Sequence, residues 1–167
     1  VPTPWATAKA AIDLAQHVTA ADTPAVRWQV GEDLEEFGPF RDMMDPTVFG
    51  HPGKMSDTAL FKCDPSAAGD AGGIHSNSGV PNHAYALMVD GGSYNGHTVT
   101  ALGGTKAGKI QYRALTRYLL SGSGFRDDYY ALHRSCMDLI GTAGITGAET
   151  EQLVRISLPT WQRGWMP

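Results

Sequence analysis

Long apolar runs, excess positive charge and internal repeats are all missing from this sequence. No apolar stretch approaches the roughly 18 residues that a membrane-spanning helix needs. The net charge is -4, and the basic residues do not cluster as they would on a surface that binds nucleic acid or an anionic membrane. The first residues also lack the charged and then apolar plan of a signal peptide, so we expect a secreted form to have lost its signal earlier. Neither a membrane nor a nucleic acid is an expected partner.

Several catalytic motifs are missing as well. None of the six histidines is followed by glutamate or stands four residues from another histidine, so the His-Glu-x-x-His zinc motif does not occur. The sequence also contains no glycine-rich phosphate loop, no nucleophile elbow and no Cys-x-x-Cys pair. A zinc site of the His-Glu-x-x-His type is therefore absent from the sequence.

Cysteine is scarce, with only Cys63 and Cys136. Two cysteines permit a single disulfide, and a bridge between Cys63 and Cys136 is one expectation. The sequence does not show that the two residues meet, so two free thiols are the alternative.

The composition is typical of one globular domain. The chain has 167 residues, enough to bury a core, and 42% of them are apolar, while 20 glycines and 10 prolines predict many turns. Helical spacing and capping residues predict helices over about 5–20, from Asn77 or Ser78 to Gly91, over 107–119 and 129–140, and after the capping box Thr146–Glu149. We therefore expect a mainly α domain of about five helices.

Two non-helical features complete this prediction. Residues 27–57 are interrupted by proline and glycine, which favours a long ordered loop with one helical turn. Asn95-Gly96 lies between two short β-prone segments and predicts a small β-hairpin. The chain is best treated as one domain, with an N-terminal helix in 1–26, a helical body in 27–158 and an aromatic tail in 159–167.

The densest group of special residues surrounds one histidine, in GDAGGIHSNSGVPNHAYALMVDGG. Asp70 and His75 stand five residues apart across Gly72-Gly73, a spacing that suits a loop folding the acid back onto the imidazole. A carboxylate on one ring nitrogen fixes the tautomer and favours the protonated ring, which leaves the other nitrogen to donate a proton or a hydrogen bond. The pair is thus a candidate oxyanion stabiliser. On these residues alone, a structural hydrogen bond is the more common role of such a pair.

Arg41 is a second candidate, in the segment FGPFRDMMDP. Its planar guanidinium could hold a carbonyl or carboxylate of a substrate. The alternative is an ion pair with the nearby Asp42 or Asp45 that only braces the loop.

Four segments, VGED, FGPFRDMMDPTVFG, GDAGGIHSNSGVPNHAYALMVDGG and KAGKIQYRALTRYL, together resemble the C-terminal half of the thermolysin-like (M4) zinc metallopeptidases. The resemblance runs from about Arg27 to Gln152, and its Asp-x-Gly-Gly-x-His-x-Asn-Ser-Gly core is highly specific. In that family this half is a mostly helical domain that forms one wall of the active-site cleft. The other half carries the His-Glu-x-x-His helix.

The resemblance implies roles for four residues. His75 would donate a hydrogen bond to the developing oxyanion, and Asp70 would orient its imidazole. Arg41, with Phe40 beside it, would bind the peptide substrate. The family also implies an extracellular or secretory compartment.

The same resemblance shows what is missing. The family's third zinc ligand is a glutamate on the helix before the GED loop, yet no Asp or Glu precedes Asp13 in this chain. Residues 1–26 are therefore interpreted as a remnant of the zinc-helix region. All three zinc ligands and the catalytic glutamate base are lacking, so zinc would have to come with another polypeptide.

Calcium ligands of the family are only partly retained near GED. Glu32 and Asp33 are present, whereas Arg27 and Gln29 stand where acids are expected. The resemblance therefore does not predict a complete calcium site.

Two functions follow from these observations. In the first, the chain is the C-terminal half of a metalloendopeptidase and needs an N-terminal half, or another subunit, for the zinc site. In the second, it is a catalytically inactive module that acts as a structural or protein-interaction subunit, because the zinc helix lacks its glutamate. A metal site rebuilt from Asp70, His75 and His83 is a third and weaker alternative, since their spacing matches no familiar ligand pattern.

Overall fold

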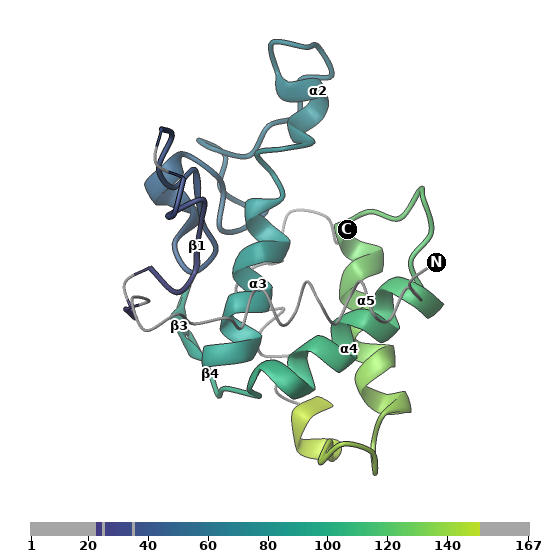
Figure 1. Cartoon of the computed structure of the whole chain (residues 1–167). Coiled ribbons are helices and arrows are strands. Elements are labelled where there is room, and N and C mark those ends of the chain that lie inside the picture. The colour runs from purple at the N-terminus through teal and green to yellow at the C-terminus, as the bar shows by residue number, and fades with distance from the viewer. Residues whose placement is uncertain (1–22, 25, 35, 151–167) are drawn as a thin grey trace, which may run out of the picture.

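A computed structural model describes residues 23–24, 26–34 and 36–150 of the chain (Figure 1). In chain order its elements are β1 (Gln29–Val30), β2 (Arg41–Asp42), the 3-10 helix η1 (Pro46–Phe49), α2 (Asp70–Gly73), α3 (Gly79–Asp90), β3 (Gly92–Tyr94), β4 (His97–Val99), α4 (Gly104–Arg117) and α5 (Phe125–Asp138). Residues 147–150 are helical as well. The helix expected over 5–20 and the aromatic tail 159–167 lie outside the described residues.

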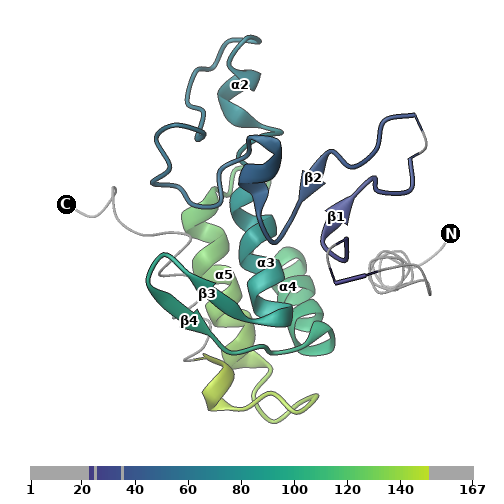
Figure 2. The same cartoon turned by 90° about the vertical axis from the view of Figure 1, so that its left-hand side faces the viewer.

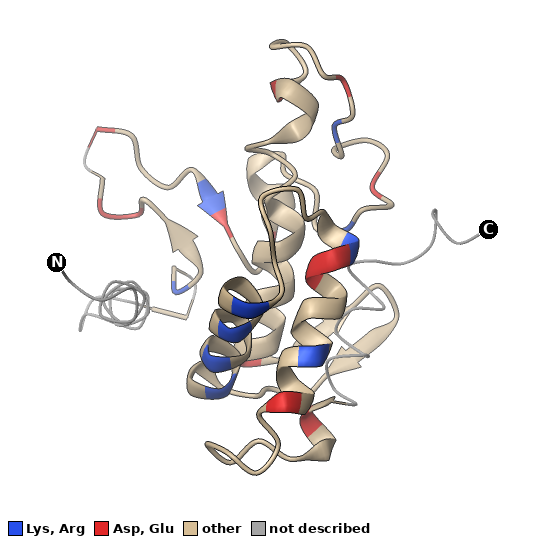
Figure 3. Ribbon diagram, turned by 90° about the vertical axis from the view of Figure 1, so that its right-hand side faces the viewer, with Lys and Arg blue, Asp and Glu red and all other residues tan. Residues whose placement is uncertain are grey.

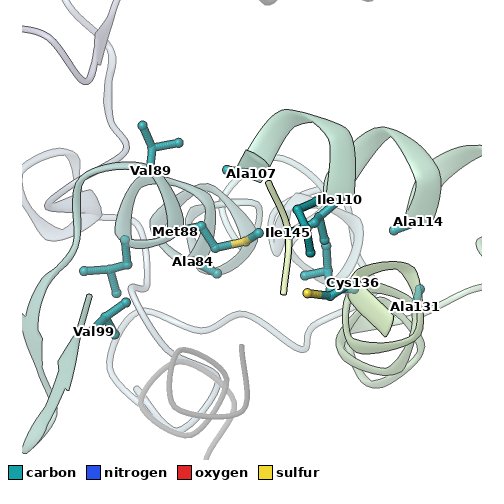
Figure 4. Close-up of a cluster of buried hydrophobic side chains, with 12 residues drawn as sticks. Ala84, Met88, Val89, Val99, Ala107, Ile110, Ala114, Ala131, Cys136 and Ile145 are labelled. Carbon is teal, nitrogen blue, oxygen red and sulfur yellow. The ribbon is translucent and has the colours of Figure 1, made fainter. Parts of the chain in front are cut away.

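Three helices form the body of the domain, which confirms the mainly α prediction. Figure 2 shows α3, α4 and α5 side by side, with the β3–β4 hairpin across one end. The apolar stripes expected on two of these helices face each other: Ile110 of α4, Cys136 of α5 and Ile145 lie close together in the core (Figure 4). No helix among the described residues is long and apolar enough to cross a bilayer.

The hairpin prediction at Asn95-Gly96 is also confirmed. β3 and β4 pair antiparallel with Tyr94 opposite His97, so that only Asn95 and Gly96 form the turn. Both have positive φ, 49° for Asn95 and 80° for Gly96, which is the backbone that a two-residue turn between twisted strands requires.

The long loop before α2 is ordered, as expected, and contains the one helical turn, η1. Asp45 caps η1 by accepting a hydrogen bond from the Thr47 amide, and η1 lies against α3. The sequence analysis did not predict that β1 and β2 pair, with Val30 opposite Arg41. Strands of two residues are too short to leave an alternating pattern in the sequence.

The expected disulfide is not formed, because the two cysteines lie in different environments. Both are free thiols, Cys63 exposed in the loop before α2 and Cys136 buried in the core. Burial raises the pKa of the Cys136 thiol, so this residue acts as a small apolar side chain in the core.

Ion pairs link the outer sides of the helices. Figure 3 shows the basic residues of α4 along its length, and Arg113 among them donates two hydrogen bonds to Asp138 of α5, at 3.0 and 2.9 Å. Lys106, also on α4, donates to Glu149. These contacts tie α4 to the two segments that follow it.

Four successive residues in α2 have a left-handed backbone, which is rare for amino acids with a side chain. Their φ values are 58° for Asp70, 47° for Ala71, 84° for Gly72 and 83° for Gly73. A left-handed conformation costs roughly 1–2 kcal/mol for each residue that carries a Cβ. Two glycines reduce this cost, and a Cβ on Gly73 would also overlap the Asn77 side chain. The turn therefore needs glycine at both positions for its backbone, and at Gly73 also for space.

Alanine at the two glycines should separate these two effects. Gly72→Ala should lower the free energy of unfolding by about 1–2 kcal/mol, because the space around it is open and only the backbone is strained. Gly73→Ala should lower it further, because its Cβ must also displace Asn77. Urea denaturation of both variants measures the difference. Equal losses would mean that Asn77 moves aside freely.

The capping box at Thr146–Glu149 is present as expected. Glu149 Oε2 accepts hydrogen bonds from the Thr146 amide at 2.7 Å and from the Thr146 hydroxyl at 2.6 Å. The Ala148 amide donates to Thr146 Oγ1 at 3.3 Å. The hydrogen bond from the Lys106 ammonium, which has the largest effect, and the two from Thr146 lower the pKa of Glu149 to about 2. The cap thus stabilises the fold only while Glu149 is ionised.

This cap should make stability depend on pH in a defined range. Folding lowers the Glu149 pKa from 4.5 to about 2. The ionised carboxylate therefore makes its full contribution to the free energy of unfolding above pH 4.5, and this contribution is lost as the pH falls toward about 2. Glu149→Gln should therefore lower the Tm at pH 7, and the difference from the unsubstituted chain should shrink through that range. Thermal unfolding followed by circular dichroism tests this. A difference that is the same at pH 3 and pH 7 would contradict it.

Candidate functional site

The Asp70 carboxylate accepts four hydrogen bonds, two from the candidate histidine His75 and two from Ser76. Asp70 Oδ1 lies 2.6 Å from His75 Nδ1, and Oδ2 accepts from the His75 amide at 3.0 Å. Oδ2 also accepts from the Ser76 amide and hydroxyl, both at 2.8 Å. These contacts, led by the bond from the Ser76 amide, hold the pKa of the Asp70 carboxyl far below its usual value. Asp70 is therefore ionised at neutral pH.

The ionised carboxylate fixes the tautomer of His75. Because a carboxylate can only accept, His75 Nδ1 must carry the hydrogen of the 2.6 Å contact. The other ring nitrogen, Nε2, is left for a ligand, and the side chain of His75 is 80% exposed. The structure thus presents the imidazole at the surface, as the sequence predicted, with Asp70 behind it.

Arg41 reaches the same turn from β2. Its Nη1 donates to the His75 carbonyl at 3.0 Å and to Ser78 Oγ at 2.5 Å. The alternative partners are engaged elsewhere, since Asp42 and Asp45 accept hydrogen bonds from backbone amides of their own loop. The structure therefore brings Arg41 to the segment that carries His75 rather than to the neighbouring acids. Nη2 and Nε make no further hydrogen bond within the described part of the chain and can take a ligand.

Phe40 faces away from this group. Its ring is 48% exposed and lies over Gly31, where a Cβ would come within 2.7 Å of two ring carbons. Neighbouring residues of an extended segment point to opposite faces, so Phe40 does not share the direction of Arg41. The structure supports Arg41 and not Phe40 as a close neighbour of His75.

Asn77 is a site residue whose role the sequence analysis did not identify. Its Oδ1 accepts from the Lys62 amide at 2.9 Å, while its Nδ2 donates to the Lys62 carbonyl at 2.7 Å and to the Gly72 carbonyl at 3.1 Å. The side chain is buried and joins the loop around Lys62 to the left-handed turn. The Asn-Ser-Gly part of the motif contains Asn77, but the sequence does not predict its hydrogen bonds, because Lys62 lies 15 residues away.

A pocket of about 450 Å³ lies beside the turn. Phe61 and Phe125 form one wall with an edge-to-face contact of 6.2 Å between ring centroids. The complete lining comprises Phe61, Lys62, Cys63, Gly72, Gly73, Ile74, Asn77, Ser78, Pro81 and Phe125. Ser78 belongs both to this pocket and to the hydrogen bonds of Arg41, so the pocket adjoins the candidate site.

The residues of this part of the chain do not fit a metal site. No group of three potential ligands from His, Cys, Asp and Glu comes together between residues 23 and 150, apart from positions 25 and 35, which the structure does not describe. Glu32 and Asp33 follow β1 and are not part of such a group. His83 is buried against Tyr94 and the Gly53 carbonyl, so the rebuilt site of Asp70, His75 and His83 is not formed. Zinc chemistry cannot be derived from the described residues.

Comparison with known proteins supports the resemblance seen in the sequence. The family described as "Thermolysin metallopeptidase, alpha-helical domain" matches residues 8–153. Bacillolysin of Bacillus amyloliquefaciens is 40% identical over 124 residues, which cover 73% of this chain and 21% of that protein. A zinc metalloproteinase of Renibacterium salmoninarum is 37% identical over 136 residues, covering 79% of this chain and 24% of that protein. Neutral protease NprE of Bacillus pumilus is 38% identical over 124 residues, covering 73% and 37%.

The chain thus spans less than two fifths of the length of each of these relatives. Its match is confined to one domain of the family, the helical one. The left-handed turn, the Asp70–His75 pair and the three-helix body all lie within the matched residues. The chain therefore belongs to the thermolysin metallopeptidase family and represents its α-helical domain.

Proposed function

We propose that this chain is the C-terminal half of a metalloendopeptidase and contributes the oxyanion-stabilising and substrate-binding side of a peptidase site. The observation that carries the proposal is the exposed imidazole of His75, held by Asp70 at 2.6 Å, with Arg41 bonded to the same turn. Kinship with bacillolysin and with a zinc metalloproteinase gives the class of reaction. The compartment proposed with it is extracellular or secretory.

In this proposal His75 acts on the carbonyl of the scissile peptide bond. When water adds to that carbonyl, negative charge develops on its oxygen, and a donor placed beforehand stabilises the transition state more than the substrate. His75 Nε2 is such a donor when the ring is doubly protonated. Asp70 holds the ring in position, because its carboxylate accepts the hydrogen bond of Nδ1 and does not have to reorient during the reaction.

Arg41 would bind the substrate through the part of its guanidinium that the turn does not use. Nη1 is already held by the His75 carbonyl and Ser78 Oγ, so the guanidinium plane is fixed. A fixed planar donor loses little conformational entropy when it binds a peptide carbonyl. The zinc ion and the glutamate base would come with an N-terminal half, because the described residues cannot hold the metal.

The second candidate function is a catalytically inactive module that binds another protein. It is favoured by one observation, the absence of any Asp or Glu before Asp13, where the family carries its third zinc ligand. A peptidase half that arose by a split before that helix would keep the acid. The two candidates differ in whether the His75 site still works when a complete zinc helix is supplied.

A chimera supplies that helix. Residues 27–150 of this chain would replace the corresponding segment of Bacillus amyloliquefaciens bacillolysin, which is similar enough to accept them. The chimera should cleave a blocked peptide in the presence of zinc, and His75→Ala should lower kcat by about 100-fold or more, the usual loss when one oxyanion donor is removed. His97→Ala, in the β3–β4 hairpin, is the matched histidine control and should leave kcat unchanged.

Zinc content and thermal unfolding of the chimera separate the outcomes. A folded chimera that binds zinc but does not cleave would reject the peptidase proposal and favour the inactive module. A chimera whose activity is insensitive to His75→Ala would reject the role of this histidine.

A further inference from the structure

Basic side chains gather around the first residues of α3, beside His75. Arg41 is bound to Ser78 Oγ at 2.5 Å. The backbone of Lys62 is clamped by Asn77 through hydrogen bonds of 2.9 and 2.7 Å. Asn77 and Ser78, which immediately precede α3, thus hold two segments of the loop region that each carry a basic residue.

A third basic residue, His51, packs against Gly79, the residue that follows Ser78. Gly79 lies so close to the preceding loop that an added Cβ would come within 3.0 Å of His51 Cβ and 2.5 Å of the Pro52 carbonyl oxygen. Glycine at this position therefore lets the His51 segment pack on the start of α3. The positive charges of Arg41 and Lys62 both reach the His51 ring and lower its pKa, after the larger effect of burial and against a smaller opposite effect of Asp70.

In the part of the chain that the structure describes, no acid forms an ion pair with this group of Arg41, His51 and Lys62. Asp70 is the carboxylate whose charge acts on the His51 ring, and its two oxygens are occupied by His75 and Ser76. Arg41 and Lys62 thus carry positive charge without an ion-pair partner among the described residues, at the site where we propose that peptides bind.

We propose that Arg41, His51 and Lys62 form a carboxylate-binding site that selects peptides with an acidic side chain. This inference rests on the proposed function, since it names the substrate class of the same site. Lys62 lines the 450 Å³ pocket, which gives an acidic side chain room to approach it from the solvent. A peptide carbonyl needs one of the N–H groups that the turn leaves free on Arg41 Nη2 and Nε, and the others can pair with a carboxylate.

A bound carboxylate must also change the titration of His51. A negative charge nearby stabilises the protonated imidazole and raises its pKa, in the opposite direction to the present effect of Arg41 and Lys62. By linkage, the acidic peptide binds more tightly as pH falls and His51 becomes protonated. The charged groups that act on this ring are Arg41 of β2, Lys62 of the following loop and Asp70 of the turn.

Histidine-ring NMR on the complete 167-residue chain tests the proposal without zinc, a partner or catalysis. The probes are acetyl-Leu-Glu-Ala-amide and acetyl-Leu-Gln-Ala-amide, which differ only in the side-chain charge. At low salt the Glu peptide should bind about fivefold more tightly than the Gln peptide and should raise the His51 pKa. His97 and His133 serve as internal controls, and their titration should not move.

Substitutions locate the effect. Lys62→Met and His51→Gln should each abolish most of the preference for the Glu peptide, and Lys62→Arg should retain it. Lys109→Met, which removes an exposed lysine from α4, is the matched control and should change nothing. Amide spectra of each variant verify the fold. If one of Lys62→Met and His51→Gln does not fold, the other is compared with the control.

The outcomes are distinct from those of the chimera. Equal affinity for the two peptides, an unchanged His51 titration, or the same effect from Lys62→Met and Lys109→Met would overturn the carboxylate site and leave the peptidase proposal untouched. Acetyl-Leu-Gln-Ala with a free C-terminus distinguishes the other source of a carboxylate. Tighter binding of that peptide than of the blocked Glu peptide would overturn selection of an acidic side chain.

Discussion

The geometry of the site depends on the carboxylate of Asp70. Its two oxygens accept four hydrogen bonds from His75 and Ser76, and these bonds close a turn whose backbone is left-handed over four residues. Each of the non-glycine residues in that turn opposes its conformation by about 1–2 kcal/mol, so the turn exists only because the carboxylate and the two glycines stabilise it. The same carboxylate sets the tautomer of the imidazole. The same carboxylate therefore stabilises the strained backbone of the turn and orients the His75 ring.

Local features of the fold could be predicted from the sequence, because neighbouring residues determine them. Asn95-Gly96 specifies its turn by the left-handed backbone that both residues accept, and Thr146 and Glu149 cap each other over three residues. The helical stripes of α4 and α5 predicted their buried faces through the period of the helix alone. In each case the information lies within about one turn of the chain.

Contacts between distant segments could not be predicted in this way. The pairing of β1 with β2, the clamp of Asn77 on Lys62, and the approach of His51 to Gly79 join residues 11 to 28 positions apart, and no period or cap encodes them. For the cysteines the sequence predicted a contact that does not form. Two cysteines suggested a disulfide, but Cys63 is exposed and Cys136 is buried. For the site itself, the sequence predicted that Asp70 holds His75, but it assigned Arg41 only two partners, a substrate or a neighbouring acid. The structure shows a third, the backbone carbonyl of His75.

Arg41 thus has a second consequence for the electrostatics around His75. A guanidinium bound to the carbonyl of His75 brings a permanent positive charge to the turn. Lys62 adds a second positive charge that acts on the His51 ring, and Asp70 opposes the two charges only in part. Positive charge at the turn stabilises any negative charge that forms or binds there, whether it is an oxyanion at Nε2 or a carboxylate of the substrate. The two proposals for this chain therefore draw on one physical property of the start of α3, and they differ in when the negative charge is present: only in the transition state for the first, and already in the bound peptide for the second.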